Sequence, residues 1–379
     1  MKAAVLEAPQ KISVREIPSP APLPHQVLVR VGAVGLCGTD IHIFRGEGNY
    51  NMAPSGRVIP LEEQPQILGH EFCGLVVDTG GEVKGVRPGD RVVVDQGLNC
   101  YSAQRQPICE YCDTGDSHQC QFYQEHGITG VQGAMADLVA VPAVNTVEIP
   151  ENLGFAEAVM SEPLACVLHA VSFLERAGGR FTFDGERKIR SILICGSGPA
   201  GLLFVQYLRN VKGFQGLIIV ADTQDGKLAL ARQYGAECLN VSQVNLIEAV
   251  AELTAGNRVE CLIDACGSAQ VYEQIPWLLR KQGTVLLYGH GHRGKDIGII
   301  NLVQFLEPTL VSPIGASGHF TSDHRPAIYA EAAEAIRSRT IDVKTMVTHR
   351  FQGLEAIQQA LTTEYSRPTY IKGIVQLSD

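Results

Sequence analysis

The stretch GLCGTDIHIF, residues 35–44, places a thiol, a hydroxyl and an imidazole close together, directly after an apolar strand-like run. These groups belong to Cys37, Thr39 and His42. A single cysteine here would fit a buried core, because free cysteine is among the most buried residue types. With suitable partners from elsewhere in the chain, the same three groups can bind a metal and move a proton.

A second imidazole and two carboxylates could supply those partners. ILGHEFCG places His70 and Glu71 on another strand-like run, and SEPLAC places Glu162 at the start of a helix. A carboxylate in apolar surroundings is costly unless it is paired or binds a metal. Taken singly, His70 would fit a hydrogen-bonded core histidine and Glu71 a surface charge. Together with Cys37 they form a mixed sulfur, nitrogen and oxygen set, the pattern of a catalytic zinc site with an open position.

Four more cysteines gather in one polar segment that includes a C-x2-C pair: Cys100, Cys109, Cys112 and Cys120. Four thiolates form the closed tetrahedral set of structural zinc. Packing in a core does not fit a polar segment, and a zinc-ribbon interaction module is the other functional interpretation. The remaining cysteines lie in apolar patterns and are predicted to be core residues: Cys73, Cys166, Cys195, Cys238, Cys261 and Cys266.

A glycine motif predicts a dinucleotide site. Gly196, Gly198 and Gly201 form G-x-G-x-x-G directly after the apolar run 191–195 and at the start of a helical pattern. Such glycines let the backbone turn tightly and approach a pyrophosphate, which the helix N-terminus stabilises. Asp222 ends the next strand, where a carboxylate binds adenosine ribose hydroxyls and repels a 2′-phosphate. We therefore predict NAD over NADP; a turn with a helix-capping aspartate is the alternative.

Composition limits the class of protein. The 379 residues include 31 Lys and Arg against 40 Asp and Glu, a net charge of -9. This balance disfavours generic binding to nucleic acid or to an anionic membrane. No apolar run approaches the length of a bilayer span, and the N-terminal residues lack the pattern of a secretory signal. The 11 cysteines, an odd number, fit a reducing compartment, so a cytoplasmic location is expected.

Two types of element must position these groups. Up to about residue 150, short strands follow one another with Gly-Gly and Pro-Gly turns, which predicts a β-barrel-like domain. From residue 191 onward, fully apolar strands alternate with helices, which predicts a parallel sheet covered on both faces. Helical patterns at 326–338 and 353–364 then precede a final strand. The loop 45–66 is long and rich in Gly and Pro, and such loops are usually functional or disordered.

In chain order, GHE, VRPGDRV, the four-cysteine lobe, EPLA, GSGPAG and IDACG resemble the zinc-dependent medium-chain dehydrogenase/reductase (alcohol dehydrogenase) family over nearly the whole chain. GHE with EPLAC most resembles the sorbitol and threonine dehydrogenase branch. The resemblance implies an α/β protein with a GroES-like β-barrel catalytic domain over 1–163 and a Rossmann NAD-binding domain with a doubly wound parallel sheet over 164–315. Residues 316–379 would return to the catalytic domain. It also implies an active-site cleft between the domains and a homodimer or homotetramer.

Carried over residue by residue, the resemblance assigns roles to the groups named above. Cys37, His70 and Glu71 would bind the catalytic zinc, and Glu162 would do so directly or through water. Thr39 would hold the hydroxyl position of a proton relay, and His42 its outer end. The four-cysteine set would hold a structural zinc. Two departures stand out: eight residues separate the first two cysteines of that set where the family usually has two, and the loop 45–66 is longer than usual.

The expected activity is NAD-dependent oxidation of a secondary alcohol of a polyol, sugar or cyclitol to the ketone, with no nucleic-acid or membrane partner. The nearest alternative is an amino-alcohol dehydrogenase of the threonine type. It would need a partner for the substrate carboxylate, for which Arg57 in the long loop is a candidate. A zinc protein that binds NADH without turnover is the alternative from another class. Intact Cys37, Thr39 and His70 argue against it, because such a protein has no use for a relay.

Overall fold

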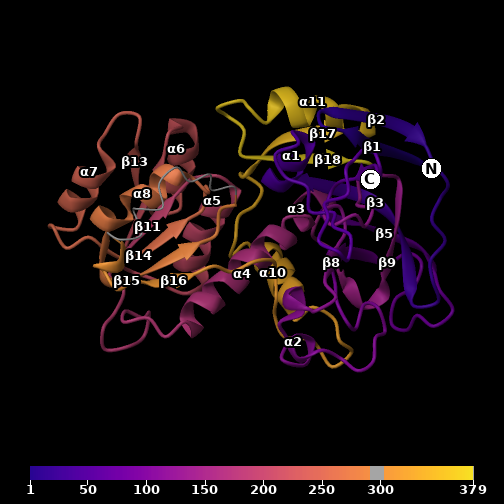
Figure 1. Ribbon diagram of the computed structural model, residues 1–379, viewed down its shortest axis with the longest axis horizontal. Coiled ribbons are helices and arrows are strands. Elements are labelled where there is room, and N and C mark those ends of the chain that lie inside the picture. The colour runs from indigo at the N-terminus through magenta and orange to yellow at the C-terminus, as the bar shows by residue number, and fades with distance from the viewer. Residues whose placement is uncertain (291–302, 379) are drawn as a thin grey trace. The chain divides into compact units, whose positions relative to one another are not determined.

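The structure is a computed structural model that describes residues 1–290 and 303–378 (Figure 1). It contains two compact units, the first made of Met1–Ala165 and Gly315–Asp379, the second of Cys166–Ile314. Helix α4 (Ser161–Arg176) carries the chain from the first unit into the second. The chain therefore leaves the first unit close to the predicted boundary at residue 163 and returns to it close to residue 315.

The first unit is built on a mixed sheet. Its strands are β3 (Gln26–Leu36), β5 (Glu71–Thr79), β6 (Arg91–Val94), β9 (Leu138–Pro142), β10 (Thr146–Glu148), β17 (Val347–Gln352) and β18 (Lys372–Gln376). Their order is β10-β6-β5-β3-β18-β17, and β9 also pairs with β3. The central strand β3 alternates between buried and less buried residues at its start and is buried throughout from Val31 onward, as a strand at the centre of a core requires.

Smaller elements complete the first unit. The strands β1 (Lys2–Ala8), β2 (Lys11–Glu16) and β4 (Gln66–Ile67) form a second sheet in the order β2-β1-β4, and β7 (Gly97–Leu98) pairs with β8 (Gln124–Glu125). The helices are α1 (Gly38–Phe44), α2 (Glu110–Asp113), α3 (Phe155–Ala158), α10 (Ala327–Arg337) and α11 (Ile357–Gln359). The helical pattern predicted at 353–364 becomes a 3-10 turn, α11 and a π turn in succession.

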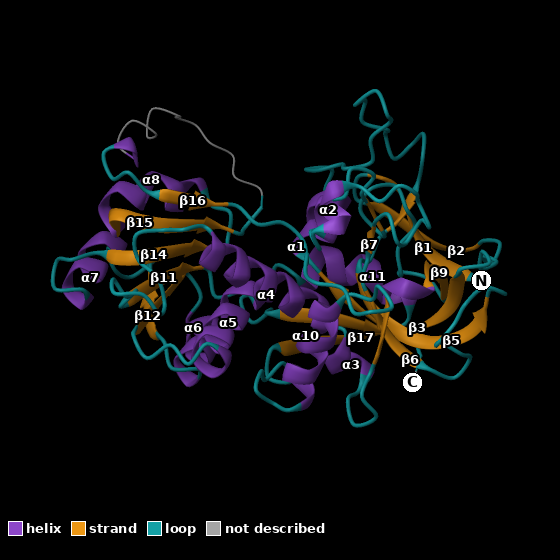
Figure 2. Ribbon diagram, turned by 90° about the horizontal axis from the view of Figure 1, so that it is seen from below, coloured by secondary structure: helices purple, strands orange, loops and turns teal. Residues whose placement is uncertain are grey.

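The second unit contains a parallel sheet. Its strands are β11 (Ser191–Cys195), β12 (Leu217–Asp222), β13 (Glu237–Asn240), β14 (Val259–Asp264), β15 (Leu279–Leu287) and β16 (Thr309–Val311). Among the described residues the order is β13-β12-β11-β14-β15-β16, and every neighbouring pair is parallel. Figure 2 shows β12, β11, β14, β15 and β16 side by side. This order is that of a doubly wound dinucleotide-binding sheet, which confirms the predicted fold class.

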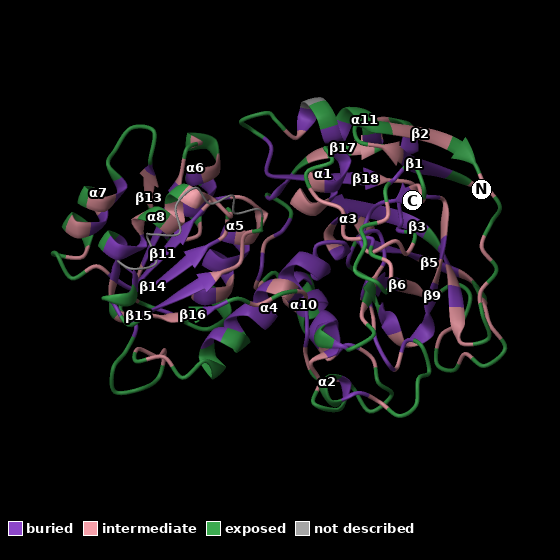
Figure 3. Ribbon diagram, viewed as in Figure 1, coloured by how far each residue is buried: buried purple, intermediate pink, exposed green. Residues whose placement is uncertain are grey.

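Helices cover this sheet, and its central strands are fully buried. They are α5 (Pro199–Gln206), α6 (Asp225–Gln233), α7 (Leu246–Leu253) and α8 (Ala269–Leu278). Every residue of β11 and β14 is buried, whereas α6 and α7 each show an exposed face (Figure 3). Strands buried on both faces read as continuous apolar runs, and for this reason the sequence identified them.

A side chain from another segment meets the last turn of α8. This helix ends at Leu278, and Leu279 already has an extended backbone that starts β15. The Arg258 Nη1 group donates a 2.9 Å hydrogen bond to the carbonyl of Pro276. A continuing helix would need that carbonyl for the N–H of residue 280, so a distant side chain caps the helix here.

The stretch Phe155–Arg176, which spans α3 and α4, is long and apolar enough to cross a membrane by length and composition alone. The sequence pattern predicts no such stretch, so this prediction is wrong. Of its most apolar window, 78% is buried inside the structure. Core helices of globular proteins have the same properties, so this segment is weak evidence for a membrane span.

Candidate active site

Two strand ends bring three of the predicted metal ligands together. Cys37 follows β3 as the N-cap of α1, and His70 and Glu71 lie at the start of β5. These strands are antiparallel, and Gly35 faces Glu71 across them. The ligand atoms of the three side chains all lie within 4.8 Å of one another. Strand register therefore assembles a thiol, an imidazole and a carboxylate from two distant segments.

Gly35 makes room for the carboxylate of Glu71. A Cβ atom built on Gly35 would lie 2.0 Å from Glu71 Oε2, a distance that real Cβ contacts do not reach. Only glycine at this position lets the carboxylate sit across the strand. Sequence reasoning missed this role, although a glycine inside an apolar strand is a sign of close approach by another group.

Asp40 links the two ligand segments. Its buried carboxylate accepts hydrogen bonds from the N–H of Cys37 (3.0 Å) and the N–H of Gly69 (3.1 Å). Asp40 Oδ1 also lies 3.5 Å from Nδ1 of His70. Burial lowers the pKa of His70, but the charges of Asp40 and Cys37 outweigh it and raise the pKa well above its ordinary value. Asp40 is thus the outer partner that metal-binding histidines commonly have.

Lys372 is a buried cation beside the same ligands. Its Nζ lies 2.6 Å from Oε1 and 2.5 Å from Oε2 of Glu71, and the two side chains are 2% and 1% exposed. Burial lowers the pKa of Lys372, but the charges of Glu71 and Cys37 raise it overall. Lys372 starts β18, which pairs with β3 so that Gly373 faces Leu36. The lysine is distant from Glu71 in the sequence, and no local pattern could have revealed the pair.

This donor set fits zinc. A thiolate, an imidazole and a carboxylate together make up three-ligand catalytic zinc sites, which keep a further position for water or substrate. Buried anionic groups this close repel one another unless a cation lies between them. Cys37 is only partly buried, so one side of the set remains accessible. The residues that would hold the ion are Cys37, His70 and Glu71, as the sequence predicted.

Glu162 lies outside this three-ligand set. It occupies the first turn of α4 and is buried, and its Oε1 accepts a 2.9 Å hydrogen bond from Gln96 Nε2. Gln96 also donates to Glu125 and accepts a hydrogen bond from Tyr329. Gln96 therefore orients Glu162. A role for Glu162 as a ligand, directly or through water, stays a prediction.

Helix α1 carries the two groups predicted to form a proton relay. Cys37 Sγ lies 3.8 Å from Thr39 Oγ1, so the hydroxyl is next to the ligand set. Thr39 and His42 are three positions apart on the helix and share one face. Nδ1 of His42 lies 2.7 Å from Glu47 Oε2, and the His42 side chain is 38% exposed. The helix thus leads from a group beside the ligands to one that meets solvent.

The four cysteines predicted for structural zinc form a second cluster, and all four are buried within 4.8 Å of one another. Cys120 Sγ lies 3.7 Å from Cys100 Sγ and 3.8 Å from Cys109 Sγ. Backbone N–H groups point at the sulfurs, from Cys109 to Cys100 and from Phe122 to Cys120, both at 3.4 Å. The unusual spacer between the first two cysteines does not keep Cys100 away from the cluster.

The electrostatics of this cluster favour a cation. Burial opposes ionisation of Cys109, but N–H groups of Cys112 and Gln121 and the neighbouring thiols lower its pKa to about 6. Burial raises the pKa of Cys112 and of Cys120. Four thiolates in contact repel one another and can ionise together only around a cation. The set fits the closed tetrahedral coordination of zinc.

The glycine motif of the second unit has the geometry that nucleotide binding needs. Gly198 is the N-cap of α5 and lies three positions after the end of β11. Gly196 has φ +103°, and a Cβ on Gly201 would lie 1.9 Å from the Gly196 carbonyl oxygen, so both positions require glycine. A Cβ on Gly198 would meet nothing within 4 Å. The motif therefore leaves open space at the N-terminus of the helix.

Asp222 ends β12 beside this motif, as predicted. Its Oδ2 accepts a 2.7 Å hydrogen bond from the N–H of Ser197, and its Oδ1 accepts one of 2.9 Å from the N–H of Gln224. The carboxylate thus holds the glycine loop and also the turn before α6. Both interpretations of Asp222, as a loop-bonding residue and as a group placed for a ribose, are compatible with these contacts.

One other expectation differs from the structure. Cys266 is exposed and not part of the core, because it lies in the turn after β14, where its N–H and thiol donate to Asp264 Oδ1. Arg57 forms two hydrogen bonds of 2.9 and 3.0 Å with the carboxylate of Glu63 on the exposed loop. Of the remaining cysteines predicted to be core, Cys166 and Cys238 are partly buried, and the others are buried.

Comparison with known proteins agrees with this geometry. The alcohol dehydrogenase GroES-like domain matches residues 23–151, and the zinc-binding dehydrogenase domain matches residues 199–334. The chain is 28% identical to L-threonine 3-dehydrogenase of Pyrococcus furiosus, over 91% of this chain and 89% of that protein. It is 29% identical to sorbitol dehydrogenase of Halalkalibacterium halodurans, over 89% of this chain and 88% of that protein.

Solved structures share the fold over the full length. A short chain alcohol dehydrogenase from E. coli CFT073, complexed with NADH, has a TM-score of 0.80 at 26% identity and covers 100% of this chain and 99% of its own. A protein from Sinorhizobium meliloti 1021, bound to NADP, has a TM-score of 0.78 at 27% identity and covers 99% of each chain. With both domain models matched in order on one chain, the protein belongs to the zinc-dependent medium-chain dehydrogenase/reductase family.

Proposed function

We propose that this protein is a NAD-dependent zinc dehydrogenase that oxidises a secondary alcohol of a polyol, sugar or cyclitol to the ketone. The observation that carries the proposal is the set formed by Cys37, His70 and Glu71, with the Thr39 hydroxyl 3.8 Å from the thiol. A structural zinc site is closed by four protein ligands, whereas this set offers three and leaves a position open beside a hydroxyl. The similarity to sorbitol dehydrogenase supports a polyol as the substrate class.

The chemistry divides between the cofactors and the chain. Bound zinc supplies a Lewis acid that lowers the pKa of an alcohol, and NAD supplies a hydride acceptor. The Thr39 hydroxyl accepts the proton of the substrate hydroxyl and donates its own proton onward. His42, one turn further along α1, would form the outer end of the relay, where its side chain meets solvent and its Nδ1 lies 2.7 Å from Glu47 Oε2. Asp40 and Lys372 keep the ligands in place throughout.

Asp222 supports NAD as the cofactor, because its carboxylate would repel a 2′-phosphate. The fold alone does not choose, since a structure of the same fold contains NADP. We expect wild type to prefer NAD, and Asp222→Asn to shift the ratio of kcat/KM values toward NADP by about tenfold. Asparagine has a single acceptor oxygen, so this variant removes the charge together with one of the two hydrogen bonds from the N–H groups of Ser197 and Gln224, and retained NADH binding shows that the loop is still in place. A wild-type enzyme that uses both cofactors equally contradicts the assignment.

A substrate panel tests the proposed reaction. Zinc-loaded protein with NAD is offered polyols, inositols, sugar acids and L-threonine, and NADH formation is followed by absorbance. We expect turnover of a polyol or cyclitol. Turnover of L-threonine alone would show that the substrate is an amino alcohol and not a polyol or cyclitol. The candidate partner for the threonine carboxylate, Arg57, forms a hydrogen bond with Glu63 in the structure. No NADH formation from any compound would contradict a dehydrogenase of this substrate range.

The proposal extends to location and assembly. A cytoplasmic enzyme is supported by the cysteines, because all 11 are free in the structure and thiolate zinc sites need reducing conditions. The family resemblance favours a homodimer or homotetramer. Light scattering of the purified protein distinguishes these assemblies, and a monomeric mass would contradict both.

A further inference from the structure

The second unit contains a cavity that the proposed reaction does not use. Its volume is about 710 Å³, and its walls come from the segment 180–190, the start of β15 and the residues just before β16. Two carboxylates, those of Glu186 and Glu307, line it. Six cations line it as well: Arg180, Arg187, Lys188, Arg190, Arg280 and Lys281. The cavity is therefore strongly positive on a chain whose net charge is -9.

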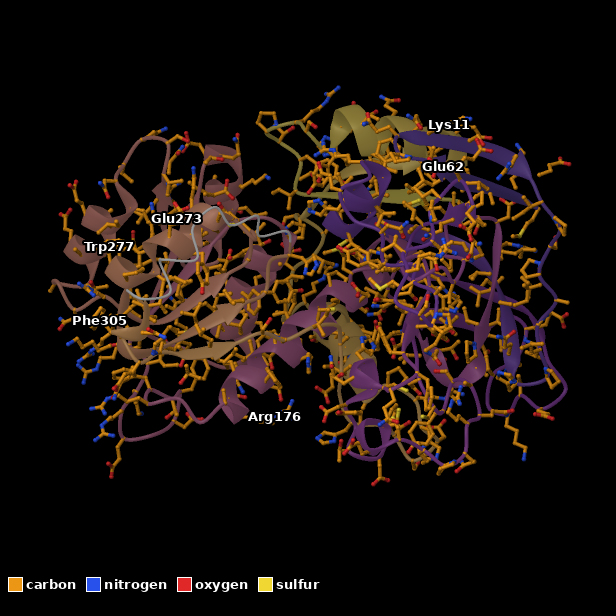
Figure 4. The ribbon with its side chains drawn as sticks, in the orientation of Figure 1. Lys11, Glu62, Arg176, Glu273, Trp277 and Phe305 are labelled. Carbon is orange, nitrogen blue, oxygen red and sulfur yellow. The ribbon has the colours of Figure 1, made fainter. Side chains whose placement is uncertain are left out.

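This cavity lies at the sheet edge opposite the glycine motif. Gly196 follows the carboxyl end of β11, whereas Arg190 directly precedes its amino end. Six residues of extended chain separate the two positions by roughly 20 Å. Figure 4 shows Phe305, another lining residue, at the outer edge of the sheet near β15 and β16. The pyrophosphate of NAD at the glycine motif is therefore a different ligand from any occupant of this cavity.

Among the residues that the structure describes, most of these cations have no carboxylate as counter-ion. Arg280 pairs with the buried Glu260 at 2.7 Å. Within the described part of the chain, no ion pair joins the side chains of Arg187, Lys188, Arg190 and Lys281 to a carboxylate. Glu307 accepts a 2.9 Å hydrogen bond from Gln282. Like charges in a concave site focus a positive potential, so a bound anion would relieve their repulsion.

We propose that the cavity binds a small organic molecule that carries two or more phosphate groups. Its volume falls within the range of small-molecule sites, about 300–1,000 Å³. Guanidinium groups match phosphate oxygens in pairs, and lysines add point charges. Phe181 and Phe305 offer apolar walls for the organic part, and the Arg280 guanidinium lies 5.1 Å from the centre of the Phe181 ring.

The shape and charge of the molecule favour this ligand over a macromolecule. Nucleic acid binds along an extended positive surface, with affinity that comes from many phosphate contacts. Here the cations gather around one cavity, and the chain as a whole repels a polyanion of that size. A compact, multiply charged phosphate fits both the volume and the local charge.

Isothermal titration with inorganic tripolyphosphate tests the proposal. The protein is loaded with zinc and saturated with NADH, so that the pyrophosphate position at the glycine motif is already filled. We expect saturable binding that weakens as salt is added. The double variant Arg187→Glu/Lys188→Glu should bind about tenfold more weakly or worse, because attraction becomes repulsion at two positions. The matched control Lys11→Glu/Lys84→Glu changes the same charge on the first unit and should bind as wild type does.

Three outcomes would overturn the proposal. The first is the absence of binding to the NADH-saturated wild type. The second is equal affinity of Arg187→Glu/Lys188→Glu and Lys11→Glu/Lys84→Glu for tripolyphosphate. The third is a changed mass of Arg187→Glu/Lys188→Glu in light scattering with unchanged phosphate affinity, which would assign these cations to a contact between proteins. Retained NADH binding shows that the variant is folded, and Arg187→Gln/Lys188→Gln replaces it if the charge reversal prevents folding. NADH formation from alcohols tests the proposed function separately.

Discussion

The two candidate zinc sites of the first unit are assembled in different ways. The four-cysteine cluster comes from one stretch, Cys100 to Cys120, and uses only thiols and nearby N–H groups. The Cys37 set joins the end of β3 to the start of β5 and has partners from α1 and from the last strand, β18. One short segment is thus enough to supply all four ligands of the candidate structural zinc site. The candidate catalytic set mixes donor types and depends on the register of strands from distant parts of the chain.

This difference predicts different responses to mutation. Changes around the Cys37 set should affect turnover strongly, because its neighbours include the proton relay and the support of the ligands. Changes in the four-cysteine cluster should affect stability, because nothing in that cluster faces a substrate in the proposed mechanism.

Thr39→Val should produce the largest effect. The substitution keeps the shape of the side chain and removes both the donor and the acceptor of the relay. Turnover should fall by about 10²-fold or more, the usual contribution of a positioned proton-transfer group. Zinc content and NADH binding should stay unchanged, and both are measured on the same preparation.

His42→Ala is compared with Thr39→Val. Turnover of His42→Ala should fall less than that of Thr39→Val, because water or buffer can replace the exposed outer end of a relay. Near-normal turnover of Thr39→Val, in a step shown to be limited by chemistry, would remove the relay from this account.

Gly35→Ala should have the next largest effect. The new Cβ would lie 2.0 Å from Glu71 Oε2 and must displace the carboxylate. We expect a loss of about 10–100-fold in zinc retention at this site or in turnover, the scale of changes around metal ligands. Gly81→Ala is the matched control, because a Cβ there meets nothing within 4 Å. Equal behaviour of the two variants in zinc content and turnover would mean that Glu71 is not a ligand.

Cys109→Ser should have the smallest effect on chemistry. It opens the structural cluster, so the melting temperature should fall by several degrees, at about 2–4 °C per kcal/mol lost. Turnover per folded molecule should stay close to wild type, with the zinc of the Cys37 set retained. Cys266→Ser is the control, because this exposed thiol belongs to neither cluster. A fully stable Cys109→Ser enzyme without activity would contradict the division between the two sites.

The same contrast explains what the sequence could reveal. The four cysteines, the glycine motif and the apolar strands of the second unit lie in short, regular patterns, so spacing alone identified them. Asp40, Gly35 and Lys372 act through contacts between distant strands. Their residue types are ordinary, and only the pairing of β3 with β5 and β18 gives them a role. The carbonyl of Pro276 in the last turn of α8 likewise finds its partner in Arg258, which lies 18 positions earlier in the chain.

The most direct test of the account is zinc content and turnover measured on one preparation of Cys37→Ala. Wild type should contain about two zinc ions per chain, from two complete ligand sets. The variant should keep about one, stay folded and still bind NADH, while forming no NADH from the alcohol that wild type oxidises. Turnover close to wild type in Cys37→Ala, with about one zinc remaining, would contradict the claim that the Cys37 set performs the reaction.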